Sequence, residues 1–153
     1  MMNPFKYGLS YVLLSIASGY QGRGNFQKVI DFSLKAKAIS PTSTIVLKQC
    51  YLLICDDYRR IKAYDQAIIT TQEALRQFPN EEFFYQLMVM ALTEKGEKIE
   101  KVIPFIKNYL MIREKKNCKI STIMKRFLKL FQKDVDIEAY GKQIEKWDDE
   151  WSI

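Results

Sequence analysis

The sequence predicts an all-α fold, namely a short α-solenoid of antiparallel helix pairs with a C-terminal capping pair. Apolar residues recur at helical spacing along almost all of the 153 residues, and no segment alternates as a half-buried strand would. Glycine and proline fall between the periodic segments, where they end helices. An internal repeat with an offset of 38 residues is the third observation. Together these features indicate stacked helix pairs.

The hydrophobic period and its breaks place each helix in order. Asn3 and Pro4 suit the N-cap and the first turn of the first helix. Pro104 falls inside the sixth helix, where it should either kink that helix or mark its first turn. Breaks between helices are expected at Gly22, Gly24, Pro41, Pro79 and Gly96. The eight expected helices span residues 3–22, 26–39, 43–60, 64–77, 81–94, 98–113, 118–132 and 135–149.

The repeat is clearest around two turns of the chain. Small residues at matched positions let two helices approach closely, matched aromatics fill the space between them, and a proline ends each unit. Around the turns, the pairs are Phe26 with Tyr64, Val29 with Ala67, Ala36 with Ala74 and Pro41 with Pro79. Upstream, Leu13, Ile16, Ala17 and Tyr20 align with Tyr51, Ile54, Cys55 and Tyr58.

This succession of helix, tight turn, helix and proline resembles the tetratricopeptide repeat (TPR). The offset of 38 residues exceeds the family's period of about 34. The third unit is degenerate, because Lys98, Lys101 and Asn108 replace its aromatic and small residues. The resemblance implies one TPR-like domain over residues 1–153, with units at about 10–43, 44–81 and 82–115 and capping helices within about 118–149.

The composition argues against several kinds of catalysis. The chain has no histidine, which removes imidazole bases and imidazole metal ligands. It has no phosphate-binding glycine loop, and its acidic pairs are adjacent in sequence, so they do not face each other on a helix. Cys50, Cys55 and Cys118 fit small buried hydrophobes in a reducing compartment, although lysines around Cys118 leave a redox role open. We therefore expect no enzyme, no cofactor and no metal site.

The net charge of +6 is unevenly distributed. Residues 113–133 carry a net charge of +7, whereas residues 134–153 carry −5 and include Trp147 and Trp151. Both segments are amphipathic, as the capping pair of a solenoid should be, and the two tryptophans could also anchor a partner. An alternative is a charge-driven binder of RNA or of an anionic membrane. That surface would comprise Lys115, Lys116, Lys119, Lys125, Arg126 and Lys129.

By its resemblance to TPR proteins, the first helix of each unit should line a concave, largely apolar groove. Such a groove suits an amphipathic helix of a partner protein, so the expected function is that of an adaptor, scaffold or chaperone-like module. Chaperone tails of the Hsp70 and Hsp90 kind are not expected, because the places of the family's carboxylate clamp, which hold Lys, Arg and Asn there, hold Leu14, Ser18, Leu53, Phe83 and Leu87 here. The expected groove residues are Tyr11, Leu14, Gln49, Leu52, Leu53, Asp56, Arg59, Arg60, Phe83, Gln86, Leu87 and Met90.

The N-terminal segment allows two interpretations. Lys6 followed by the apolar run 9–17 outlines a short signal peptide, in which case the protein would be exported. The repeat pattern continues through residues 11–20, which favours a structural helix and a reducing compartment such as the cytoplasm. The sequence offers no segment of about 18–20 uncharged apolar residues that would span a membrane.

Overall fold

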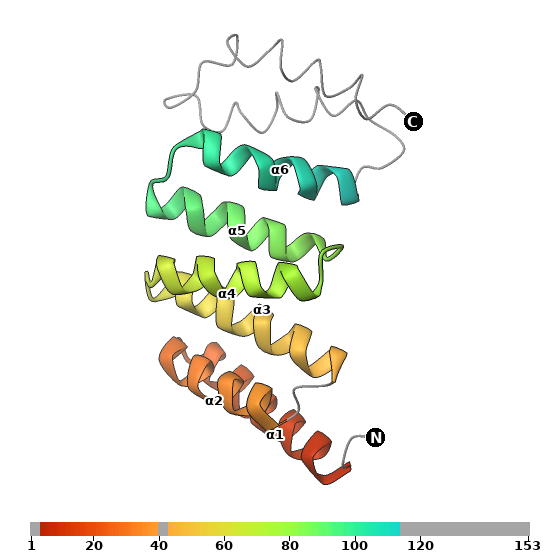
Figure 1. Cartoon of the computed structure of the whole chain (residues 1–153). Coiled ribbons are helices and arrows are strands. Elements are labelled where there is room, and N and C mark those ends of the chain that lie inside the picture. Colours follow the sequence, from red (N-terminus) through yellow and green to blue (C-terminus); the bar gives the residue numbers. More distant parts are fainter. Residues whose placement is uncertain (1–3, 40–42, 114–153) are drawn as a thin grey trace. The chain divides into compact units, whose positions relative to one another are not determined.

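The computed structural model of the chain describes residues 4–39 and 43–113, and these form helices joined by short turns (Figure 1). No strand occurs among these residues, so the predicted all-α class is confirmed. Each helix end lies within one residue of its expected position. The expected helices over 118–132 and 135–149 lie outside the described residues. The helices are α1 (Pro4–Gly22), α2 (Phe26–Ile39), α3 (Thr44–Arg60), α4 (Tyr64–Gln77), α5 (Glu82–Lys95) and α6 (Ile99–Arg113).

The chain divides into two compact units, Met1–Pro79 and Asn80–Ile153. In the first unit α1 packs on α2, α2 on α3 and α3 on α4, and α1 also touches α3. In the second unit α5 packs on α6. The helical repeat is confirmed within the first unit, because α4 begins and ends 38 residues after α2. Consecutive helices therefore pack as neighbours in each unit, as expected for repeated helix pairs.

Three turns close their helix pairs in the same way. Each contains one residue in the left-handed region: Gly24 at φ +75°, Lys62 at φ +63° and Gly96 at φ +87°. Glycine adopts this region without a steric penalty, whereas lysine does not. In each turn the following backbone N–H donates to a carbonyl five residues earlier, which satisfies the end of the preceding helix. These bonds run from Asn25 to Tyr20 (3.0 Å), from Ala63 to Tyr58 (2.9 Å) and from Glu97 to Leu92 (3.0 Å).

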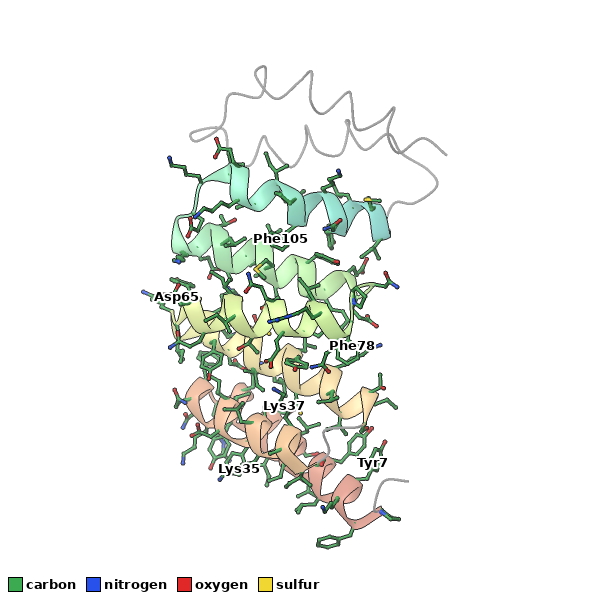
Figure 2. All side chains as sticks on the ribbon, viewed as in Figure 1. Tyr7, Lys35, Lys37, Asp65, Phe78 and Phe105 are labelled. Atoms are coloured by element: carbon green, nitrogen blue, oxygen red, sulfur yellow. The ribbon has the colours of Figure 1, made fainter. Side chains whose placement is uncertain are left out.

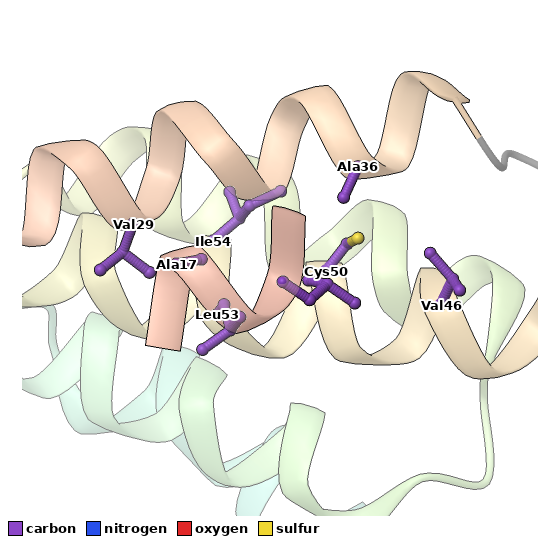
Figure 3. Packing of buried hydrophobic residues seen from close by; sticks show 8 residues of the cluster. Ala17, Val29, Ala36, Val46, Cys50, Leu53 and Ile54 are labelled. Atoms are coloured by element: carbon purple, nitrogen blue, oxygen red, sulfur yellow. The ribbon is translucent and has the colours of Figure 1, made fainter. Parts of the chain in front are cut away.

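The core of the first unit is built where α1, α2 and α3 meet (Figure 3). Ala17 and Ala36 are fully buried there, and their small side chains allow the helix backbones to approach closely. Cys50 and Cys55 are buried free thiols, as the sequence predicts. Burial raises the pKa of Cys50 to about 11 and that of Cys55 to about 12, so both are apolar packing groups. The cluster comprises Leu14, Ala17, Val29, Ala36, Val46, Cys50, Leu53 and Ile54.

Lys37 of α2, which Figure 2 labels, makes contacts with α3 and α4. The ammonium nitrogen of Lys37 lies 4.7 Å from the ring centroid of Tyr51 on α3. The same nitrogen lies 3.7 Å from Oε2 of Glu73 on α4. A long side chain of this kind covers apolar surface while its charge stays near water. Lys37 therefore helps to hold α2 against the following pair.

The second unit has its own buried face between α5 and α6. Phe84 and Met88 of α5 are fully buried, as is Ile106 of α6. Pro104 is exposed and lies inside α6 beyond its first turn, so of the two expected roles the one as first-turn residue is wrong. Its exposed position on the solvent side leaves the buried face of α6 continuous.

Candidate functional site

The exposed side of α3 combines an apolar half with a charged half. Ile45 keeps 64% of its surface exposed, and Leu52, two turns later, is half-buried. The charged half follows in the last turns of the same helix. These positions recur at helical spacing and so share one side of the helix. The α3 face consists of Ile45, Gln49, Leu52, Asp56, Arg59 and Arg60.

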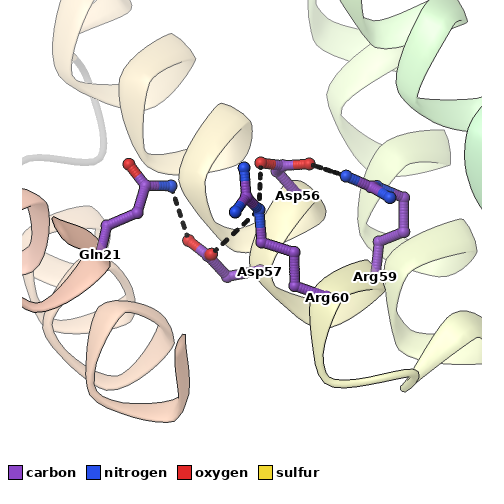
Figure 4. Close-up of polar contacts among 5 residues, drawn as sticks. All are labelled: Gln21, Asp56, Asp57, Arg59 and Arg60. Carbon is purple, nitrogen blue, oxygen red and sulfur yellow. Dashed lines mark hydrogen bonds and ion pairs between the residues drawn. The ribbon is translucent and has the colours of Figure 1, made fainter. Parts of the chain in front are cut away.

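The charged half of the α3 face is held by a compact network (Figure 4). Arg59 donates two hydrogen bonds to Oδ1 of Asp56, from Nε at 3.2 Å and from Nη2 at 2.8 Å. Arg60 donates from Nε to the other oxygen, Oδ2, at 3.0 Å. The Arg60 guanidinium also lies 5.2 Å from the ring centroid of Phe26 on α2. The Asp56 carboxylate therefore holds both arginines in place.

Asp57 lies behind this network and has no exposed surface. Its Oδ2 accepts a hydrogen bond of 3.3 Å from Nε2 of Gln21 on α1. Its Oδ1 accepts none from the described residues and lies 3.9 Å from Nε of Arg60. Burial is the main cause that raises the pKa of Asp57 to about 6, and the neighbouring Asp56 carboxylate raises it further. Gln21, Arg60 and Arg59 oppose the shift. Asp57 therefore joins α1 to α3 at an electrostatic cost.

The predicted groove residues of the first unit separate into surface and core. Tyr11 is exposed on α1, where its hydroxyl accepts a hydrogen bond of 2.9 Å from Tyr7. Leu14 and Leu53 belong to the buried cluster, so their side chains pack in the core and do not line an open groove. Gln49, Leu52, Asp56, Arg59 and Arg60 share the α3 face.

The second unit places its four predicted residues on α5. Phe83 and Met90 are half-buried, Gln86 is exposed and Leu87 is buried. The ring of Phe83 lies 4.6 Å from that of Phe84 between centroids. Phe83, Gln86 and Met90 therefore form a short, partly exposed stripe on α5, and Leu87 contributes to packing.

Ile45 is a surface residue that the sequence-based set omits. It lies one turn before Gln49 and two turns before Leu52. Continuing the same helical period towards the N-terminus of α3 would have found it. The expected groove residues were taken from positions that match between the two repeat units. Ile45 lies before those positions, at the start of α3, where the second unit is longer than the usual repeat.

Several other residues that the sequence singles out lie beyond the part of the chain that the structure describes. The basic residues Lys115, Lys116, Lys119, Lys125, Arg126 and Lys129 lie outside it, as do Cys118 and both tryptophans. Within residues 4–39 and 43–113, no three His, Cys, Asp or Glu side chains gather as metal ligands would. The helices in those ranges are too short or too polar to cross a bilayer.

A hollow of about 540 Å³ lies beside the α5–α6 turn. Its lining includes the charged residues Glu97, Lys98 and Glu100.

Comparison with known proteins adds no family assignment. No family model matches the chain, and no curated protein matches its sequence. The TPR resemblance therefore rests on the residues quoted above for the two matched units.

Proposed function

We propose that this protein is a non-enzymatic interaction module, an adaptor or scaffold with TPR-like repeats, that binds a helical segment of another protein on the α3 face. The observation that carries the proposal is the α3 face itself, where exposed Ile45 and half-buried Leu52 adjoin arginines fixed by Asp56. Apolar and arginine side chains are enriched at the centres of protein interfaces. Groups that are already ordered lose little entropy when a partner binds.

The chemistry of the face indicates the chemistry of its partner. An amphipathic helix with apolar anchors two turns apart would match the spacing of Ile45 and Leu52. An acidic side chain one or two turns further along would meet Arg60, whose side chain is 43% exposed. Such a charge pair at the edge of an interface mainly speeds association and selects orientation. Phe83, Gln86 and Met90 supply a second stripe of similar chemistry in the second unit.

The test is affinity capture from the native source with single variants on the α3 face. Ile45→Glu and Leu52→Glu should each weaken partner recovery at least about tenfold, because a carboxylate would enter an apolar contact. Phe83→Glu tests the α5 stripe in the same way. Ile69→Glu on α4 is the matched control, because Ile69 is 62% exposed and does not belong to the α3 face.

Two further measurements make the outcome decisive. Circular dichroism should show equal helicity for all four variants, so that lost recovery reflects lost contact. Capture at two salt concentrations, with and without nuclease, separates a protein partner from RNA, since charge-driven binding falls steeply with salt. Unchanged recovery with folded Ile45→Glu and Leu52→Glu would exclude the α3 face as the binding surface.

A further inference from the structure

Two neighbouring carboxyl groups of α3 compete for one arginine. Nε of Arg60 lies 3.0 Å from Oδ2 of Asp56 and 3.9 Å from Oδ1 of Asp57. It is therefore bonded to the first and just out of hydrogen-bond reach of the second. Figure 4 shows Arg60 beside both carboxyl groups. A movement of about 1 Å would exchange one bond for the other, and the Arg60 side chain is 43% exposed, which leaves it room to move.

The two carboxyl groups differ in what can replace Arg60. The Asp56 side chain is 19% exposed, and Arg59 donates two hydrogen bonds to its Oδ1. Water and Arg59 can therefore satisfy Asp56 when Arg60 leaves. Asp57 is fully buried, and its Oδ1 accepts no hydrogen bond from the described residues. An ionised Asp57 consequently gains more from Arg60 than Asp56 loses, because water cannot take the place of the arginine.

The surroundings of Asp57 bring both of its protonation states within reach near neutral pH. Burial, followed by the Asp56 carboxylate, raises its pKa to about 6. No charge of α2 or α4 is among the causes of this shift, and α2 contributes the uncharged ring of Phe26, 5.2 Å from the Arg60 guanidinium. The side chains that act on Asp57 are Asp56, Arg59 and Arg60 of α3 and the neutral Gln21 of α1.

The contacts in the structure match the protonated state of Asp57. A neutral carboxyl group tolerates an oxygen without a donor better than a carboxylate does. With Asp57 neutral, the remaining charge for Arg60 to meet is that of Asp56, and this is the bond that the structure contains.

We propose that Arg60 moves from Asp56 to Asp57 when Asp57 loses its proton, and that this movement changes the charge that the α3 face offers to a partner. With Asp57 protonated, the Arg60 guanidinium stays at the surface, where an acidic side chain can meet it. With Asp57 ionised, Arg60 turns inward and Oδ2 of Asp56 is left to accept a different donor. The consequence for a partner rests on the function proposed above, whereas the movement is a property of the free chain.

The first experiment follows the free full chain by NMR between pH 4.5 and 8 in an isotope-labelled sample. The Asp57 carboxyl carbon reports its ionisation, and nuclear Overhauser contacts report the position of the Arg60 side chain. Contacts from Arg60 to the Asp57 methylene group should strengthen, and those to the Asp56 methylene group should weaken, with the midpoint at which Asp57 ionises. Ionisation of Asp57 without a change in these contacts would overturn the proposal.

Variants separate the charge of Asp57 from other effects of pH. Asp57→Asn retains an oxygen for the hydrogen bond from Gln21 and carries no charge, so Arg60 should keep its contacts to Asp56 over the whole range. Asp31→Asn is the matched control, because Asp31 lies on α2 and bonds to Gln27. It should leave the movement of Arg60 intact. Movement of Arg60 that persists in Asp57→Asn would contradict the proposed cause.

Arg60→Gln tests the same coupling from the side of the arginine. It should raise the midpoint of the Asp57 titration by about one pH unit, because the ionised form loses the cation that it attracts. Lys62→Gln removes a neighbouring cation that is not among the causes of the Asp57 shift, and it should leave the midpoint in place. An equal midpoint in wild type and Arg60→Gln would show that Arg60 does not respond to Asp57.

Partner recovery distinguishes this inference from the proposed function. An acidic partner should be recovered at least about threefold less at pH 7.5 than at pH 5.5 by the wild type, and equally at both by Asp57→Asn. Recovery by the wild type that is independent of pH would overturn the effect on the α3 face. Full recovery by folded Ile45→Glu would instead reject the α3 face as the binding surface, while the NMR contacts of the free chain still decide whether Arg60 moves.

Discussion

Lys62 is the clearest case of a single residue whose backbone conformation conflicts with its type. It holds a left-handed conformation that its two counterparts, Gly24 and Gly96, adopt without strain. For a residue with a Cβ this conformation costs about 1–2 kcal/mol. The 38-residue repeat demands the turn at this position, and the hydrogen bonds that close the turn supply the compensation.

Lys62→Gly should therefore raise the free energy of unfolding by about 1 kcal/mol, because it removes the backbone strain of the folded state. Part of this stabilisation is offset, since glycine also makes the unfolded chain more flexible. Urea unfolding followed by circular dichroism measures the change. Lys62→Ala is the matched control, because it removes the charge and retains the Cβ. An equal gain from Lys62→Ala would show that the backbone conformation is not the cause.

Asp57 makes stability depend on pH. Its pKa in the folded protein, about 6, exceeds the ordinary value of 3.8, so folding favours the protonated form. The free energy of unfolding should therefore increase as the pH falls from above 6 towards 4, as far as this residue contributes. Asp57 should change the free energy of unfolding over this pH range by on the order of 2–3 kcal/mol.

The variant Asp57→Asn isolates that effect. It retains an oxygen that can accept the hydrogen bond from Gln21, and it carries no charge. At pH 7 it should be more stable than the wild type, and the difference should shrink towards pH 4. Chemical unfolding at pH 7, 6, 5 and 4 provides the comparison. A difference that stays constant over this range would contradict the assignment.

At the scale of single helices, close approach depends on small side chains at chosen positions. Ala36 of α2 is fully buried against α1 and α3, whereas Ala38, half a turn away, is exposed. The two alanines have the same intrinsic helix propensity, so only their surroundings differ.

Ala36→Leu should lower the free energy of unfolding by about 1–3 kcal/mol, because the larger side chain forces α2 away from its neighbours. The control Ala38→Leu should change it by less than about 0.5 kcal/mol. Thermal unfolding of both variants tests this. Equal effects would mean that α2 does not pack as closely as the structure shows.

Helix positions were predictable because they depend on local sequence. All six described helices fall within one residue of expectation, since glycine, proline and hydrophobic period act over a few residues. The site was predicted less well. Leu14 and Leu53 were placed in a groove, but they lie in the core. A leucine on a helix has the same local pattern in either place, and only its neighbours decide.

On the scale of the whole molecule, the first unit should open cooperatively around its shared core. Cys50 and Cys55 are buried on α3, and burial keeps both as protonated thiols at neutral pH. Alkylation requires a thiolate that solvent can reach. Both cysteines therefore report on loss of the packing between α2, α3 and α4.

Iodoacetamide should leave Cys50 and Cys55 unmodified in the native protein and label both over the same denaturant range in which helicity is lost. Peptide mass spectrometry after a labelling pulse gives the two extents separately. Rapid labelling of Cys50 or Cys55 in buffer would show that the α3 core opens locally.

The sequence by itself determined the fold class, the helix boundaries and the 38-residue repeat, because each depends on short-range spacing and on backbone limits of glycine and proline. Only the tertiary structure decided which apolar residues are core and which are surface. Ile16 and Ile54 occupy matched repeat positions, yet Ile16 is 38% exposed and Ile54 is 1% exposed. The reason is physical: α2 packs against the face of α3 that holds Ile54, whereas no described helix covers the corresponding face of α1.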